Sequence, residues 1–110
     1  MKTKTETIRE LNDLARTAMG VCSRLHQTAG INALPAEDQS RIREKVELFA
    51  AFEPGNDPYG EHDFGAIEHN GIKVFWKIDY YDKALEWGSE DPSDPGKTTR
   101  VLTIMLREEY

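Results

Sequence analysis

The chain has 110 residues and a mass of 12.5 kDa, which is the length of one domain with a single core. Its 38% hydrophobic and 31% charged residues fit a globular protein, and no apolar run approaches the roughly 20 residues that cross a bilayer. The first residues, MKTKTETIRELND, lack the apolar core of a secretory signal. We therefore expect one domain over residues 1–110, in the cytoplasm and without a membrane partner.

The net charge of −6 is distributed unevenly along the chain. Residues 1–52 carry eight Lys or Arg against seven Asp or Glu, whereas residues 53–110 carry six against thirteen, a net charge of −7. A negative half repels nucleic-acid phosphates and attracts cationic surfaces. The charge pattern disfavours direct nucleic-acid binding and favours a basic protein or nucleoprotein surface as partner.

The first twenty residues predict an amphipathic helix over about 6–19. Thr3 and Thr7 are each followed three residues later by a glutamate, which is the capping-box pattern, and Gly20 supplies a stop. Apolar residues recur between them at helical spacing: Ile8, Leu11, Leu14, Ala15 and Ala18.

Residues 21–28 alternate loosely and predict a strand, with Cys22 as a small buried residue and His26 facing solvent. The lone cysteine can form no internal disulfide. Residues 29–32 are expected to turn. Pro35 suits the first turn of a second helix, which should reach Phe52 because Pro54 cannot continue it.

Asn70-Gly71 separates two alternating runs, a strong signal for a β-hairpin with arms at 64–69 and 72–81. A Pro/Gly/Ser/Asp-rich connection follows, with one helical turn expected at 83–87. The apolar run 101–106 predicts a central strand. The expected core face of the second arm comprises Ile72, Val74, Trp76, Ile78 and Tyr80. The fold class is therefore α+β, with two helices on one face of a mainly antiparallel sheet of about four strands.

The segment NDPYGEHDFG, residues 56–65, is a candidate site because it gathers Glu61, His62 and Asp63. A histidine beside carboxylates suits acid–base or metal-dependent hydrolysis. However, Asn56-Asp57-Pro58 and Gly60 are turn formers, and no metal-ligand or phosphate-binding motif is present. We therefore interpret the segment first as a bend, and we predict no metal, no cofactor and no enzymatic activity.

Aromatic and acidic residues alternate from position 75 to 94, and only Lys83 opposes six acids between 79 and 95. One interpretation is a sheet core followed by a solvated loop. The other is a partner-binding surface, since Tyr and Trp anchor interfaces and carboxylates complement a basic groove. The residues assigned to this surface are Tyr81, Asp82, Trp87, Glu90 and Asp91.

Several long strings resemble the family catalogued as domain of unknown function 3768: GNDPYGEHDFG, VFWKIDYYD and TTRVLTIMLREEY, with IRELND and TAGINALP. Gly55 departs from the acidic or polar residue expected before Asn56. The family provides no activity and no catalytic residue to carry over. Its members resemble short proteins of bacterial chromosomes, plasmids and mobile elements, which implies accessory proteins that act by binding.

The leading hypothesis is a small, acidic, non-enzymatic protein that binds another protein. One concrete form is a mobile-element inhibitor of host defence, such as an anti-CRISPR protein, that blocks a basic nucleic-acid-binding surface. The first alternative is a hydrolase using Glu61, His62 and Asp63. The second is a structural accessory subunit or homodimer.

Overall fold

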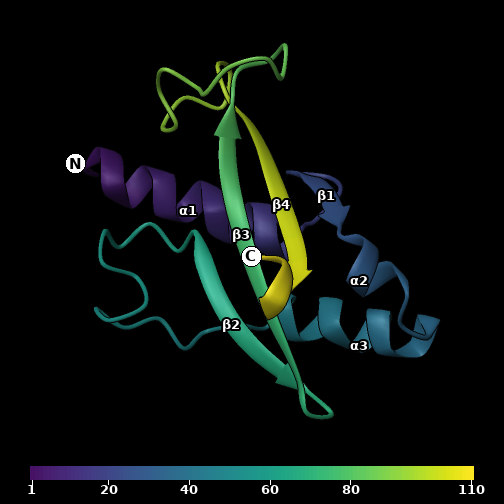
Figure 1. Cartoon of the computed structure of the whole chain (residues 1–110). Coiled ribbons are helices and arrows are strands. Elements are labelled where there is room, and N and C mark those ends of the chain that lie inside the picture. The colour runs from purple at the N-terminus through teal and green to yellow at the C-terminus, as the bar shows by residue number, and fades with distance from the viewer.

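The computed structural model describes all 110 residues and contains one four-stranded sheet (Figure 1). The strands are β1 (Arg24–Gln27), β2 (Phe64–His69), β3 (Ile72–Tyr81) and β4 (Thr99–Leu106), in the spatial order β1-β4-β3-β2. β2, β3 and β4 pair antiparallel, whereas β1 lies parallel to β4. The predicted α+β class, the mainly antiparallel sheet and the central position of the last strand are confirmed.

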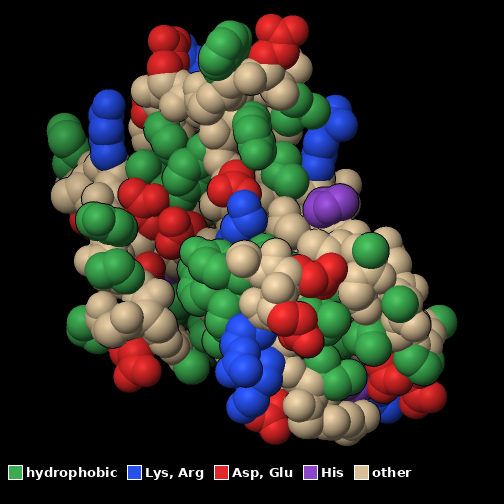
Figure 2. Space-filling view, viewed as in Figure 1, with side chains coloured by type: hydrophobic (Ala, Val, Ile, Leu, Met, Phe, Trp, Pro, Cys, Tyr) green, Lys and Arg blue, Asp and Glu red, His purple; other side chains and the backbone are tan.

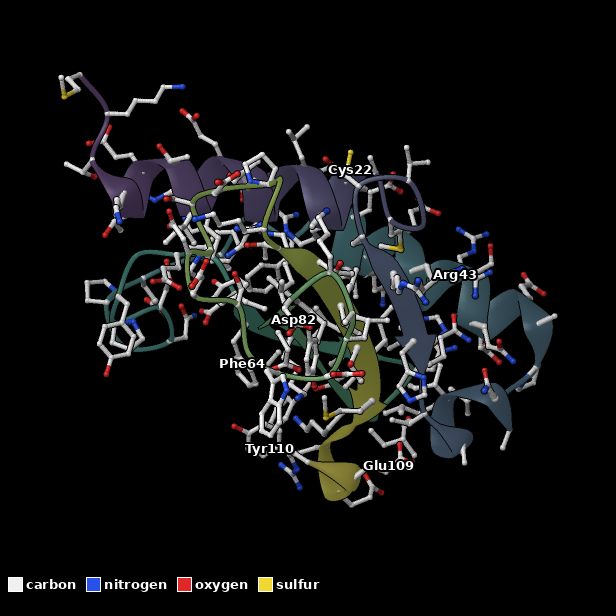
Figure 3. The ribbon with its side chains drawn as sticks, turned by 90° about the horizontal axis from the view of Figure 1, so that it is seen from above. Cys22, Arg43, Phe64, Asp82, Glu109 and Tyr110 are labelled. Carbon is white, nitrogen blue, oxygen red and sulfur yellow. The ribbon has the colours of Figure 1, made fainter.

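Two longer helices, α1 (Lys4–Thr17) and α3 (Ala36–Glu47), lie behind the sheet in Figure 1. The view from above in Figure 3 shows both on the same side of the sheet, as predicted. A one-turn helix, α2 (Ala29–Asn32), replaces the expected turn, and a 3₁₀ turn, η1 (Arg107–Glu109), follows β4. No helix combines the length and the apolar character that crossing a membrane would require.

The core lies between these helices and the inner face of the sheet. Trp76 is its largest fully buried side chain, and Val74 and Ile78 flank it on β3, so the predicted core face of this strand is correct. The Asn70-Gly71 turn closes the hairpin in the predicted register, with positive φ at both residues. The other members of the core are Ala15, Ile31, Ile42, Val46, Leu102 and Ile104.

α1 begins with the predicted capping box, formed by Thr3 and Glu6, but its buried face was only partly predicted. Leu14 is 51% exposed, and the polar side chains of Asn12 and Arg16 are buried. The helix ends at Thr17, two residues early, and the chain turns back through backbone bonds to the carbonyl of Ala18. The face that packs on the sheet is therefore partly polar.

Three other expectations were wrong: the start of the first strand, the burial of Cys22 and the helical turn at 83–87. The first strand begins at Arg24, because residues 18–23 form turns, and these leave Cys22 exposed rather than buried. His26 is exposed, as predicted. Residues 83–87 form no helix but a turn in which Leu85 has a φ of 59°.

α3 ends at Glu47 rather than Phe52 because Arg16 caps it from α1. Nη1 of Arg16 donates to the carbonyls of Val46 (3.2 Å) and Glu47 (2.8 Å), which satisfies acceptors that a longer helix would have used. The chain is then free to leave the helix. The rings of Phe49 and Phe52 pack edge-to-face against Trp76 instead, at centroid distances of 5.5 and 6.1 Å.

Candidate functional site

No helix covers the outer face of the sheet, which we define as Phe64, the outward residues of β3 and the C-terminal Tyr110. Alternation along β3 directs Phe75 and Tyr81 away from the core. The rings of Phe64, Phe75 and Tyr110 pack edge-to-face with centroids 5.1 to 5.8 Å apart. Figure 3 shows Phe64 and Tyr110 together on the side opposite the helices. This face thus presents an aromatic cluster that neither α1 nor α3 covers, and only the C-terminal turn with Tyr110 packs on it.

Three of the five predicted partner-binding residues meet at the end of β3. The backbone N–H of Asp82 donates to the carbonyl of Trp87 (2.8 Å), and Tyr81 bridges to Gly88. The Asp82 carboxylate accepts a hydrogen bond from the backbone of Glu86 (3.0 Å). The closed turn leaves Trp87 73% exposed, an unusual position for the largest apolar side chain.

The other two predicted residues, Glu90 and Asp91, lie further along the connection and have basic neighbours. Glu90 is 3.4 Å from Lys97, and Asp91 is 3.9 Å from Lys4 on α1. Ser93 donates twice to the Asp91 carboxylate, and these hydrogen bonds hold the pKa of Asp91 below its usual value. Their charges are therefore partly compensated within the chain.

We call residues 82–98 the acidic loop, since it carries five acids and two lysines and so a net charge of −3. Asp82, Glu86 and Asp94 have no Lys or Arg within 4 Å. Figure 2 shows acidic side chains at several places around hydrophobic ones on this side of the molecule, rather than in one block. The uncompensated negative charge of the acidic loop thus comes from these three residues.

Of the candidate hydrolytic residues Glu61, His62 and Asp63, the first two are hydrogen-bonded to different partners. Glu61 accepts a hydrogen bond from the Tyr80 hydroxyl (2.7 Å). Burial raises the pKa of the Asp63 carboxyl, despite a backbone hydrogen bond that opposes the shift. The structure does not bring the three side chains together, and no group of three or more His, Cys, Asp or Glu is arranged to hold a metal ion.

His62 lies between two carboxylates, in a left-handed backbone conformation with φ of 57°. Its Nδ1 is 2.9 Å from Asp13 on α1, and its Nε2 is 3.6 Å from Asp57. The ring stacks on Phe52 at 3.7 Å. Nδ1 is hydrogen-bonded to Asp13, whereas the 3.6 Å between Nε2 and Asp57 is too long for a hydrogen bond. The geometry supports the predicted bend, which His62 ties to α1.

A buried polar cluster beneath the acidic loop was not predicted. Asn12 is fully buried, and its Nδ2 donates to the Tyr80 hydroxyl (2.7 Å) and the Glu61 carbonyl (2.9 Å). Its Oδ1 accepts from Nε of Arg100 (2.6 Å). Burial raises the pKa of Tyr80, and the hydrogen bond to Glu61 adds to the shift. Asn12 lies four residues after Ile8, so helical spacing could have placed it on the buried face.

Comparison with protein-family models supports the resemblance to domain of unknown function 3768. A family model described as "Protein of unknown function (DUF3768)" matches residues 27–109. No curated protein and no solved structure shows significant similarity to the chain. The match covers β2, β3, β4, the acidic loop and the 56–65 bend, whereas α1 with the string IRELND and all of β1 except Gln27 lie outside it. The chain therefore belongs to the DUF3768 family of proteins of unknown function.

Proposed function

We propose that this protein acts by binding another protein through the turn at Asp82–Trp87 and the adjoining outer face of the sheet. The observation that carries the proposal is the presence, on one hydrogen-bonded turn, of an exposed tryptophan and two carboxylates without a basic partner, Asp82 and Glu86. Tryptophan is enriched among the residues that dominate binding energies, and peripheral charges steer association.

The charge of this turn favours a basic partner surface. Asp82, Glu86 and Asp94 give the acidic loop negative charge that no lysine or arginine of the chain compensates at close range. The nucleic-acid-binding groove of an effector complex is such a surface. Inhibition of a host-defence nuclease, in the manner of an anti-CRISPR protein, is the concrete form of this proposal.

The hydrolase alternative has less support because two of its three residues, Glu61 and His62, already have hydrogen-bond partners. Glu61 is engaged by Tyr80, and both nitrogens of His62 face carboxylates. A general acid–base pair needs a nitrogen or oxygen directed at a reacting group. Protein binding needs only the exposed groups that the turn presents.

The test measures inhibition of DNA cleavage by purified CRISPR effector complexes, together with direct binding at two salt concentrations. The variants Trp87→Ala and Asp82→Lys/Glu86→Lys should each weaken binding at least ten-fold, and salt should weaken the binding of the unaltered chain. Glu44→Lys/Glu47→Lys is the matched control, because it changes the net charge equally on an exposed part of α3.

Two outcomes would overturn the proposal in this form. One is equal binding by the Asp82/Glu86 double variant and the α3 control. The other is the absence of binding to any effector, combined with a dimer in light scattering that Trp87→Ala dissociates. The second outcome would make the same surface a homodimer contact of a structural subunit.

A further inference from the structure

A second feature lies on the other side of the acidic loop, at its junction with α1. A pocket of about 430 Å³ opens between α1, residues 20–24 and the start of β4. Small-molecule sites have volumes of roughly 300–1,000 Å³. Its lining shares one residue, Lys83, with the turn at Asp82–Trp87, and none of the residues Asp82, Glu86 and Trp87 lines it.

The pocket is cationic in a chain whose net charge is −6. Arg24, Lys83 and Arg100 line it, and no lining residue is acidic. None of the three forms an ion pair within the chain, whereas most other lysines do. The side chains of Arg24 and Lys83 are exposed, so both are available to an anion that enters the pocket.

Arg100 is the most telling of the three, because its side chain is buried. Its Nε donates to the amide oxygen of Asn12 (2.6 Å) and its Nη2 to the carbonyl of Pro92 (2.6 Å), both neutral acceptors. The ring of Tyr80 lies below the guanidinium at 5.1 Å. Burial lowers the pKa of Arg100 and outweighs the attraction of the Glu61 carboxylate, which acts on the guanidinium at longer range. No carboxylate hydrogen-bonds the guanidinium directly, so a bound anion would add a charged partner.

The remaining walls define the rest of the ligand. Leu11 and Leu14 supply an apolar side, with Val21 and Pro95 at the rim, and no aromatic ring lines the pocket. Leu14 is about half exposed, so apolar surface is available to a ligand. The Thr99 hydroxyl adds a polar group near the cations. A stacked nucleobase is not favoured, since it would find no ring to stack on.

We propose that this pocket binds a small organic phosphate, with its anionic head against Arg24, Lys83 and Arg100 and a short aliphatic part against Leu11 and Leu14. Guanidinium groups bind phosphate oxygens in paired hydrogen bonds, which favours phosphate as the head group. The pocket shares Lys83 with the protein-binding turn, but the proposed protein contacts of Asp82, Glu86 and Trp87 lie outside it, so either proposal can fail while the other stands.

Cys22 makes the proposal directly testable, because it lines the pocket, is exposed and is the only cysteine of the chain. The reaction of its thiol with a neutral maleimide, followed in the whole chain at low salt, reports occupancy of the pocket. Butyl phosphate is the probe, inorganic phosphate tests the head alone, and butanol tests the aliphatic part alone. We expect butyl phosphate to slow labelling most and butanol to have no effect.

Two matched double variants distinguish the effect of the positive charges in the pocket from the effect of the net charge of the chain. Arg24→Gln/Lys83→Gln should raise the butyl phosphate concentration needed for protection at least ten-fold. Arg41→Gln/Arg107→Gln removes the same charge at exposed positions outside the pocket and should leave protection unchanged. Arg24 and Lys83 are exposed, so circular dichroism should show an intact fold. Equal protection in the two double variants, or by butanol and butyl phosphate, would overturn the proposal.

Discussion

At the residue scale, the side chain of Asn12 joins α1 to the segment before β2, to β3 and to β4. It is fully buried, and its amide contacts Tyr80, Glu61 and Arg100. Removing one member of a buried network leaves its partners without hydrogen bonds, and one of these partners is charged. Asn12 is polar, and the amphipathic pattern of α1 suggests that it is solvated. It nevertheless helps to hold the helix on the sheet.

We predict that Asn12→Ala lowers the free energy of unfolding by about 3 kcal/mol, since it leaves Nε of the buried Arg100 without its acceptor and removes the donors to the Tyr80 hydroxyl and the Glu61 carbonyl. Urea denaturation followed by circular dichroism measures the loss. Asp13→Ala, next to it on α1, removes the contacts to His62 and Arg16 instead and should cost less because Asp13 is only partly buried. A loss for Asn12→Ala within about 0.5 kcal/mol of zero, as at ordinary surface positions, would contradict the assigned network.

Glu109 is a second residue with a defined role, fastening η1 to the start of α2. It accepts hydrogen bonds from the Thr28 hydroxyl (2.6 Å) and from the backbone of Leu106 (2.9 Å) and Gly30 (3.0 Å). The Thr28 bond is the main cause that lowers the pKa of Glu109 below its usual value. A lowered pKa means that the ionised side chain stabilises the fold above the unfolded-state pKa of 4.5 and loses this effect as pH falls through the folded pKa.

Glu109→Gln should therefore reduce stability at pH 7, with the deficit shrinking as pH falls below 4.5. Urea midpoints at pH 7 and pH 3 for the variant and the unaltered chain give the comparison. Glu108→Gln removes a neighbouring exposed carboxylate that makes no hydrogen bond, and serves as the control. A deficit of the same size at both pH values would show that the carboxylate charge has no part in the contact.

At the element scale, β2 depends on a glycine for its closeness to β3. Gly65 is opposite Trp76, and a Cβ at this position would overlap the indole ring. We predict that Gly65→Ala costs about 1–3 kcal/mol of unfolding free energy, because a packed core resists the added volume. Gly55→Ala, where nothing lies near the added carbon, should stay within about 0.5 kcal/mol. Equal denaturation midpoints for the two variants would refute the close packing.

The elements that local pattern determines were predictable from the sequence. Asn70-Gly71 indicated the hairpin and its register, and Thr3 with Glu6 indicated the start of α1, because turn and cap chemistry act within a few residues. The end of α3 was not predictable in this way. It depends on Arg16, which lies 30 residues away from the carbonyl of Val46.

The two candidate sites differ in the same way, because one is built from chain neighbours and the other from residues far apart in the sequence. Tyr81, Asp82 and Trp87 meet because they are neighbours in the chain, so the sequence could indicate them together. The phosphate pocket combines Arg24 with Arg100, and this depends on the parallel pairing of β1 with β4. Arg24 pairs in register with Val101, 77 positions further along the chain. No local pattern in the sequence specifies a parallel partner at such a distance.

At the scale of the whole molecule, the acidic loop projects from one end of the sheet (Figure 1) and should carry a negative potential around Trp87. Trp76 is fully buried, so collisional quenching of fluorescence reports on Trp87. We predict that caesium quenches it more than iodide, by about two-fold relative to free N-acetyltryptophanamide at equal ionic strength. Subtracting the signal of Trp87→Phe isolates the residue. A ratio equal to that of the free compound would argue against a charged environment.

The pairing of β1 with β4 also governs the order in which the protein can assemble. Residues 24–27 find their only strand partner in residues 101–104, and Asn12 meets Arg100 across a separation of 88 positions. On the ribosome, the hairpin of β2 and β3 can form early, but β1 stays unpaired until β4 has emerged from the exit tunnel. A nascent chain stalled before residue 99 therefore leaves β1 without its strand partner and exposes apolar residues that β4 would otherwise cover.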